Sequence, residues 1–189
     1  MKTAVCIFLI ASQIQGSAQF LKSVTGSVSF FSEAPLENID ATSQNMVSVI
    51  KTETGEITFM VTINSFQFKK QKMQVDFNED FMESSRFPMA TYTGKINEPL
   101  DWTKNGTYKV TANGKLTIHG IAKARADTAT ISIKEGKITM NSNFKIRVDD
   151  YGIRIPKVLF EKIAEVVAVK LKMSYKILPE EKKSIESSK

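Results

Sequence analysis

The sequence predicts an all-β fold of eight antiparallel strands, a sandwich or a barrel, with two short helices. Apolar and polar residues alternate through most of the chain, most clearly over residues 107–119 and 167–177. This two-residue period is typical of strands with one buried face. Turn residues such as Thr54-Gly55 and Glu135-Gly136 separate neighbouring runs. The sequence shows none of the long helices that a parallel α/β sheet needs between its strands, so hairpin connections are expected.

Each expected strand rests on its own alternating run. In the longest run, Val110, Leu116 and Ile118 share one parity, while threonines and lysines dominate the other. In the following run the apolar parity changes from even to odd numbers, which predicts a slip near Thr128. In chain order the expected strands cover residues 24–30, 47–53, 57–64, 90–96, 107–119, 122–133, 138–148 and 167–177.

Two short helices are expected outside this pattern. Asn78 is a suitable N-cap for a helix over about residues 78–83, and Pro88 would end any helix there. The second helix is expected over residues 156–164, with Pro156 near its first turn.

Residues 1–18 have the pattern of a secretory signal peptide. Lys2 precedes a short apolar run, and small residues up to Ala18 predict cleavage after Ala18. The apolar run is too short to span a membrane, which takes about 20 residues; a buried N-terminal helix is the alternative. The expected domains are therefore a signal peptide at 1–18, a single β-barrel domain at 19–178 and a disordered tail at 179–189.

Composition excludes several classes of function. Cys6 is the only cysteine and lies in the expected signal peptide, so the mature chain would have no disulfide, thiol nucleophile or thiolate metal ligand. The net charge of +6 is spread along the chain, as on ordinary solvated surfaces. The same charge would help the protein approach an anionic membrane surface or a pyrophosphate headgroup. No nucleic-acid motif is present, so nucleic acid is not an expected partner.

Small residues on the expected apolar faces leave room inside the fold. Ala112 and Gly114 occupy positions where a filled core would carry large residues, and Ala122, Ala124 and Ala126 give the next strand a small face. An eight-stranded barrel can hold one small ligand or be filled by its own side chains. On the residues alone a filled core is equally open, with the space taken by large residues opposite, such as Phe30, Phe59 and Phe144.

Candidate catalytic groups are few. His119 is the only histidine, whereas a catalytic histidine needs a nucleophile and an orienting partner, and a zinc site needs several ligands. His119 would either fix the turn at Gly120 by hydrogen bonding or contact a ligand headgroup at the barrel rim. Carboxylate pairs such as Asp149-Asp150 are expected on the surface. No catalytic or metal-binding residue is assigned, and an enzyme is not expected.

Two motifs carry a family resemblance. Leu116-Thr117-Ile118-His119-Gly120 follows a strand, and the segment from Asn78 to Pro88 has the order short helix, proline, strand. Together they resemble the YceI-like family over about residues 24–177, with one mild departure at Ile121-Ala122-Lys123. The resemblance implies an eight-stranded antiparallel lipocalin-like barrel that holds a polyisoprenoid or another long apolar molecule.

The expected function is that of an exported, non-enzymatic lipid carrier in the periplasm or secreted. It would hold a long isoprenoid, of the quinone or polyprenyl pyrophosphate type, and no other cofactor. A transient contact with a membrane surface and a homodimer formed through an exposed sheet edge are further expected partners. The alternative is a filled-core interaction or stress-response protein without lipid cargo; a lipid enzyme is the least favoured. The expected ligand-binding residues are Phe30, Phe59, Ala112, Leu116, Ile118, His119, Phe144, Ile146, Val169 and Leu171.

Overall fold

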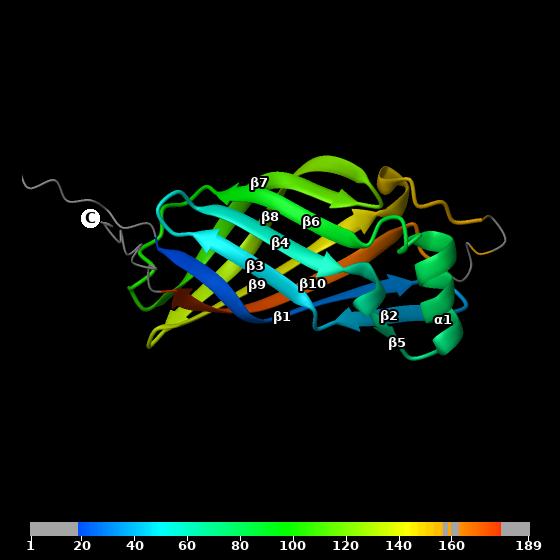
Figure 1. Cartoon of the computed structure of the whole chain (residues 1–189), viewed down its shortest axis with the longest axis horizontal. Coiled ribbons are helices and arrows are strands. Elements are labelled where there is room, and N and C mark those ends of the chain that lie inside the picture. Colours follow the sequence, from blue (N-terminus) through cyan, green and yellow to red (C-terminus); the bar gives the residue numbers. More distant parts are fainter. Residues whose placement is uncertain (1–18, 157–158, 160–162, 179–189) are drawn as a thin grey trace, which may run out of the picture.

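The computed structural model describes residues 19–156, 159 and 163–178. Within these residues eight strands close into an antiparallel barrel in the order β10-β9-β8-β7-β6-β4-β3-β1, and β1 pairs again with β10 (Figure 1). The predicted barrel is confirmed. Its strands are β1 (Phe20–Glu33), β3 (Met46–Lys51), β4 (Glu56–Thr62), β6 (Met89–Ile96), β7 (Gly106–Ile118), β8 (Ile121–Lys134), β9 (Lys137–Arg147) and β10 (Val166–Leu178).

Three of the predicted segments fall wholly or mostly on residues that the structure does not describe. They are the signal peptide at 1–18, the tail at 179–189 and the helix at 156–164, of which 157–158 and 160–162 are left out. These remain predictions from the sequence.

β1 organises the barrel because it pairs with three other strands. It runs beside β10 from Phe20↔Leu178 to Phe31↔Ala168. Its first residues also pair with β3, and its last residues pair with β2 (Asn38–Ser43). The short β5 (Gln67–Phe68) extends the sheet beyond β2. The register between β1 and β10 shifts around Val24, and this irregularity lies inside a strand that is longer at both ends than the predicted run of 24–30.

The one α-helix among the described residues begins earlier than the sequence predicted. α1 covers Gln71–Asp76 and continues into a π-helical turn, η2 (Phe77–Phe81). The proposed N-cap at Asn78 was wrong: Asn78 lies inside η2, and its side-chain amide donates to the backbone carbonyl of Gln74 at 2.8 Å. No helix among the described residues has the length and apolarity needed to cross a membrane.

The first half of β8 faces the opposite way from the prediction, whereas Ala129, Ile131 and Ile133 lie on the inner parity as predicted. Its register with β7 is unbroken from Ile118↔Ile121 to Gly106↔Ile133, so the predicted slip near Thr128 was wrong. Ala122, Ala124 and Ala126 are exposed on the outer face, whereas the odd-numbered residues from Arg125 to Ile133 are partly or fully buried. The prediction failed because it assumed that the apolar parity must be the inner one, and the inner parity of β8 includes charged residues.

A buried hydrogen bond joins opposite ends of the chain inside the core. The Tyr175 side chain on β10 is 2 % exposed, and its hydroxyl lies 3.0 Å from the Ser48 hydroxyl on β3. The Ser48 backbone N–H in turn donates to the Ser23 hydroxyl at 2.8 Å. Burial raises the pKa of the Tyr175 phenol well above its usual range. The pair thus stays neutral and fixes β10 against β3 across β1.

Replacing Tyr175 with Phe is expected to lower the free energy of unfolding by about 1–3 kcal/mol, because the Ser48 hydroxyl is left buried without its partner. Urea denaturation of the single variants and of the Tyr175→Phe/Ser48→Ala double variant measures this. The double variant should lose less stability than the sum of the two single variants. Strict additivity would show that the two hydroxyls do not interact.

Candidate functional site

The interior of the barrel contains an apolar cavity of about 200 Å³. Inward-facing side chains of the barrel strands form most of its wall, and segments between the strands add residues such as Phe66, Phe77 and Ile153. The wall is apolar with few exceptions: Thr91, the Tyr92 hydroxyl, Asp127 and Ser142. For scale, an engineered apolar cavity of about 150 Å³ in another protein stays dry and binds benzene. The volume and chemistry of this cavity suit a small apolar guest.

Nine of the ten predicted ligand-binding residues line this cavity; the exception is His119. They share the inner parity of their strands, which is the property that selected them in the sequence. Whether they contact a ligand remains a prediction. The residues at the wall are Phe30, Phe59, Ala112, Leu116, Ile118, Phe144, Ile146, Val169 and Leu171.

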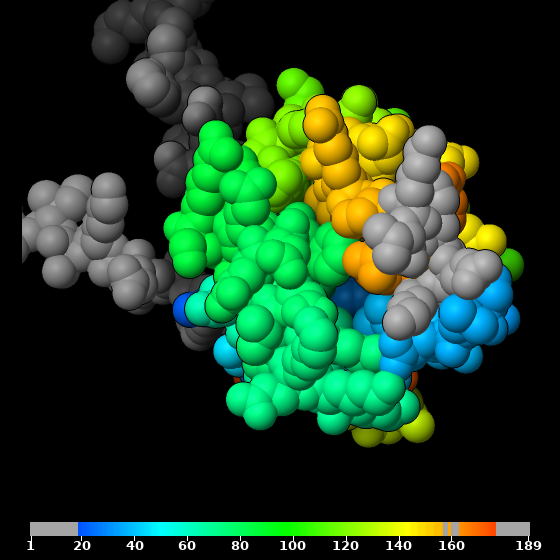
Figure 2. All heavy atoms as spheres, turned by 90° about the vertical axis from the view of Figure 1, so that its right-hand side faces the viewer, coloured from blue at the N-terminus to red at the C-terminus, as the bar shows by residue number. Residues whose placement is uncertain are grey.

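An aromatic cluster of Phe30, Phe66, Phe68 and Phe77 lies beneath α1 and η2, at one end of the barrel. Phe77 of η2 stacks on Phe30 of β1, with ring centroids 5.5 Å apart and planes inclined by 23°. Phe66 and Phe68 pack against both rings. In the view onto this end, the green helical segment covers part of the mouth, and a hollow remains between it and the orange and blue segments (Figure 2). The helical segment therefore closes the mouth only in part.

Tyr92 occupies the room that the sequence predicted beside Gly114. A Cβ added at Gly114 would lie 2.7 Å from Tyr92 Cζ, and one added at Gly94 would lie 2.7 Å from the Tyr92 hydroxyl oxygen. The phenol therefore lies over the Gly94↔Gly114 pair of β6 and β7. Of the two small residues predicted to leave space in β7, only Ala112 opens onto the cavity.

Backbone hydrogen bonds join β8 and β9 along only part of their length, and side-chain contacts join them beyond it. Their ladder runs from Lys134↔Lys137 only as far as Ala129↔Ser142. Beyond it, Arg125 bridges the two strands: its guanidinium donates to the Lys145 backbone carbonyl at 3.3 Å and lies 4.7 Å from the centre of the Phe144 ring. Side chains thus replace the missing backbone ladder.

Arg125 also forms an ion pair with Asp127, two residues along the same inner face. Arg125 Nη2 donates to Asp127 Oδ1 at 2.6 Å, and Nε donates to Oδ2. The two side chains are 19 % and 17 % exposed, and Asp127 lines the cavity. Sequence reasoning missed this pair because it placed both residues on the outer face.

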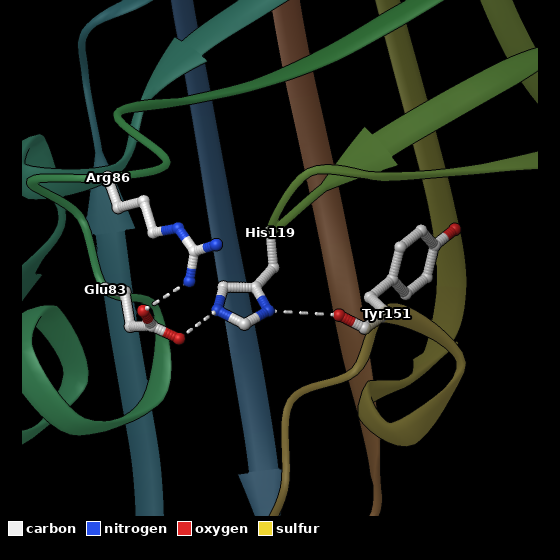
Figure 3. A network of polar contacts seen from close by, with 4 residues as sticks. All are labelled: Glu83, Arg86, His119 and Tyr151. Carbon is white, nitrogen blue, oxygen red and sulfur yellow. Dashed lines mark hydrogen bonds and ion pairs between the residues drawn. The ribbon is translucent and has the colours of Figure 1, made fainter.

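His119 lies outside the cavity lining and joins three segments at the barrel mouth (Figure 3). Its Nδ1 is 3.2 Å from the Tyr151 backbone carbonyl, and its Nε2 is 3.0 Å from Glu83 Oε1. Arg86 donates to the other oxygen of Glu83 at 3.4 Å. Both histidine nitrogens lie within hydrogen-bonding distance of an acceptor oxygen, so the ring is held from both sides. The geometry supports the interpretation of His119 as a residue that fixes its turn.

The backbone at the mouth is held in an uncommon conformation. His119 and Gly120 have φ values of 49° and 73°, and Glu83 has 42°. Two consecutive positive φ angles are what a tight hairpin of the primed type requires.

Among the described residues, no group of three or more His, Cys, Asp or Glu side chains is placed to hold a metal ion.

The environment of Tyr92 predicts a change in stability at alkaline pH. Burial, followed by the negative charge of Asp127, raises the pKa of Tyr92 from 10.0 to about 12. The unfolded chain loses this proton near pH 10 and the folded chain does not, so stability should fall as the pH rises from 10 towards 12. Urea midpoints across this range should fall less steeply in Tyr92→Phe than in the wild type. Parallel curves would contradict the assignment.

The sequence was compared with protein families and with the curated proteins. The family model for the YceI-like domain matches residues 10–175. A search of the curated proteins found no match.

Several solved structures share the fold. A polyisoprenoid binding domain from Saccharophagus degradans, described as implicated in plant cell wall breakdown, is 16 % identical with a TM-score of 0.72 and covers 85 % of this chain and 99 % of its own. BcnA of Burkholderia cenocepacia is 16 % identical with a TM-score of 0.67, covering 79 % and 95 %. The YceI protein of Campylobacter jejuni is 18 % identical with a TM-score of 0.61, covering 78 % and 90 %. At these identities the likeness establishes the fold alone.

Proposed function

This chain belongs to the YceI-like domain family, and we propose that it binds a long isoprenoid lipid inside its barrel. The observation that carries the proposal is the cavity of about 200 Å³ and its nearly continuous apolar wall. Burial of an apolar chain against such a wall is favourable by roughly 25 cal/mol per Å² before the costs of binding. The solved relative from Saccharophagus degradans is described as a polyisoprenoid binding domain, which supports the same class of ligand.

Entry of a long chain requires the aromatic cluster to move. The cavity is only about a third larger than one that accommodates benzene, so a chain of several isoprene units would displace side chains at one end. Phe77 is the natural candidate, since it is carried by η2 and not by a barrel strand. Figure 2 shows a hollow beside the segment that carries Phe77. Binding would therefore couple to a shift of α1 and η2.

The protein is proposed to act as a carrier outside the cytoplasm and not as an enzyme. Export is supported by the signal-peptide pattern of residues 1–18. A binding role is supported by the wall of the cavity, where polar groups are few. Asp127, the one carboxylate at the wall among the residues that the structure describes, is paired with Arg125.

Mass spectrometry of organic extracts tests the proposal. The full chain is purified under gentle conditions from its native host, and the extract should contain an isoprenoid in about equimolar amount. The stripped protein should take up the same compound on titration. If the purified protein contains no lipid and takes up neither quinones nor polyprenyl compounds, the filled-core interaction protein becomes the better description.

A further inference from the structure

The Tyr92 hydroxyl is a buried polar group without a partner. The residue is 9 % exposed and lines the cavity, and its hydroxyl oxygen has no hydrogen-bond partner among the described residues. Buried hydroxyls are nearly always hydrogen-bonded, so an exception calls for an explanation such as a ligand or a water. Its ring is fixed by the Phe59 ring, 6.0 Å away between centroids, and by the glycine pair beneath it. The hydroxyl is thus held in place at the edge of the cavity.

Asp127 brings a second polar group to the same wall. It pairs in register with Ala112, while its partner Arg125 pairs with Gly114, over which Tyr92 lies. Each carboxylate oxygen accepts one hydrogen bond from Arg125, and a carboxylate has about four acceptor positions in all. Asp127 can therefore accept one more bond from inside the cavity.

The charges of this wall cancel. Arg125 directs Nε and Nη2 at Asp127, and Nη2 also at the Lys145 carbonyl, so three of its five N–H donors are occupied and its positive charge is balanced by the carboxylate. A diphosphate placed here would lose its hydration and meet the carboxylate of Asp127. A neutral group that both donates and accepts a hydrogen bond would satisfy both residues: its proton to Asp127, its oxygen to the Tyr92 hydroxyl.

We propose that Tyr92 and Asp127 form a polar subsite inside the apolar cavity, and that this subsite takes the hydroxyl end of a neutral isoprenoid alcohol. The inference rests on the proposed function and narrows its ligand. A quinone carbonyl would engage Tyr92 alone, since it cannot donate to Asp127. A polyprenyl diphosphate would be disfavoured.

Three probes that share the farnesyl chain and differ only in their headgroup test this preference: farnesol, farnesyl methyl ether and farnesyl diphosphate. The full chain, stripped of lipid, is titrated with each by isothermal calorimetry. Farnesol should bind at least about tenfold more tightly than the ether, which cannot donate to Asp127, because hydrogen bonds to charged groups are the stronger ones. The diphosphate should bind more weakly than farnesol.

Two variants assign the effect to the subsite. Tyr92→Phe keeps the ring over the glycine pair and should weaken farnesol about tenfold. The matched control is Tyr108→Phe, whose hydroxyl donates to the Lys104 carbonyl on the exposed surface and which should leave every affinity unchanged. Asp127→Asn frees the charge of Arg125 and should shift the ratio of diphosphate to farnesol affinity at least about tenfold towards the diphosphate.

The outcomes distinguish the inference from the proposed function. Equal farnesol affinities in the wild type and in Tyr92→Phe would overturn the subsite. Equal affinities of the wild type for farnesol and its diphosphate would also overturn it, while leaving isoprenoid binding in place. Failure of all three probes to bind the wild type would overturn the proposed function and this inference together.

Discussion

Replacing Ala112 with Phe is expected to abolish isoprenoid uptake while the barrel remains folded. Ala112 faces the cavity from the middle of β7, opposite Ile96 on one side and Asp127 on the other. A phenyl ring there would occupy space comparable to the benzene that a smaller cavity can hold. If one five-carbon unit of the ligand loses its place, affinity should fall roughly a thousandfold, at about 0.8 kcal/mol per buried CH₂. Overpacking should cost about 1–3 kcal/mol of stability.

Ala124→Phe is the matched control for this variant. Ala124 is on the neighbouring strand but points to the outer face, where it is exposed. The same substitution there should leave uptake unchanged. Titration with a fluorescent isoprenoid measures binding, and circular dichroism with urea denaturation confirms the fold. Unchanged uptake in Ala112→Phe, or an equal loss in Ala124→Phe, would show that the ligand does not occupy the cavity.

Replacing Gly120 with Ala is expected to lower the free energy of unfolding by about 2–5 kcal/mol, the sum of two costs. The first is the left-handed backbone, since Gly120 has a φ of 73°. The second is contact, because the new Cβ would lie 2.7 Å from Phe87 Cε1. Phe87 packs edge-on against His119, with ring centroids 4.4 Å apart. Any shift of Phe87 would therefore disturb the contact between His119 and Glu83.

Gly136→Ala separates the two costs. Gly136 also follows a residue with positive φ, and its own φ is 76°, but a Cβ added there meets nothing within 4 Å. This variant should lose only the backbone contribution, about 1–2 kcal/mol. Urea denaturation of both variants gives the difference, which should be at least about 1 kcal/mol. Equal losses would show that Phe87 yields without cost.

The strands that alternate regularly could be predicted from the sequence, and so could most of the cavity wall. In β7, β9 and β10 the apolar parity is the inner parity, which is why Leu116, Ile146 and Leu171 were placed at the wall. β8 broke this rule because charged residues can face inward when they pair with each other, and the run of alanines on its outer face gave the opposite impression. Alternation reports a difference between two faces and does not say which face is inside.

The polar features of the cavity could not be predicted because they arise from contacts between distant residues. The pattern within β7 predicted free space at Gly114. The Tyr92 side chain from the neighbouring strand β6 fills that space. The same holds for Arg125, whose role depends on β9 leaving β8 at Ser142. The helix was misplaced for a local reason: Asn78 fits the chemistry of a helix start, but here its amide bonds back to the preceding turn.

The pairing of β1 with β10 has a consequence for the kinetics of folding. Phe20 and Leu178 are direct partners, so barrel closure joins the two ends of the described chain. Contacts of such long sequence separation pay a large loop-closure entropy before they form, and they slow folding. Until Val166–Leu178 is available, β1 and β9 are open edges that can pair with other chains. A nascent chain in which β10 is still inside the ribosome should therefore depend on chaperones. A circular permutant that links residues 178 and 20 should refold faster than the parent chain.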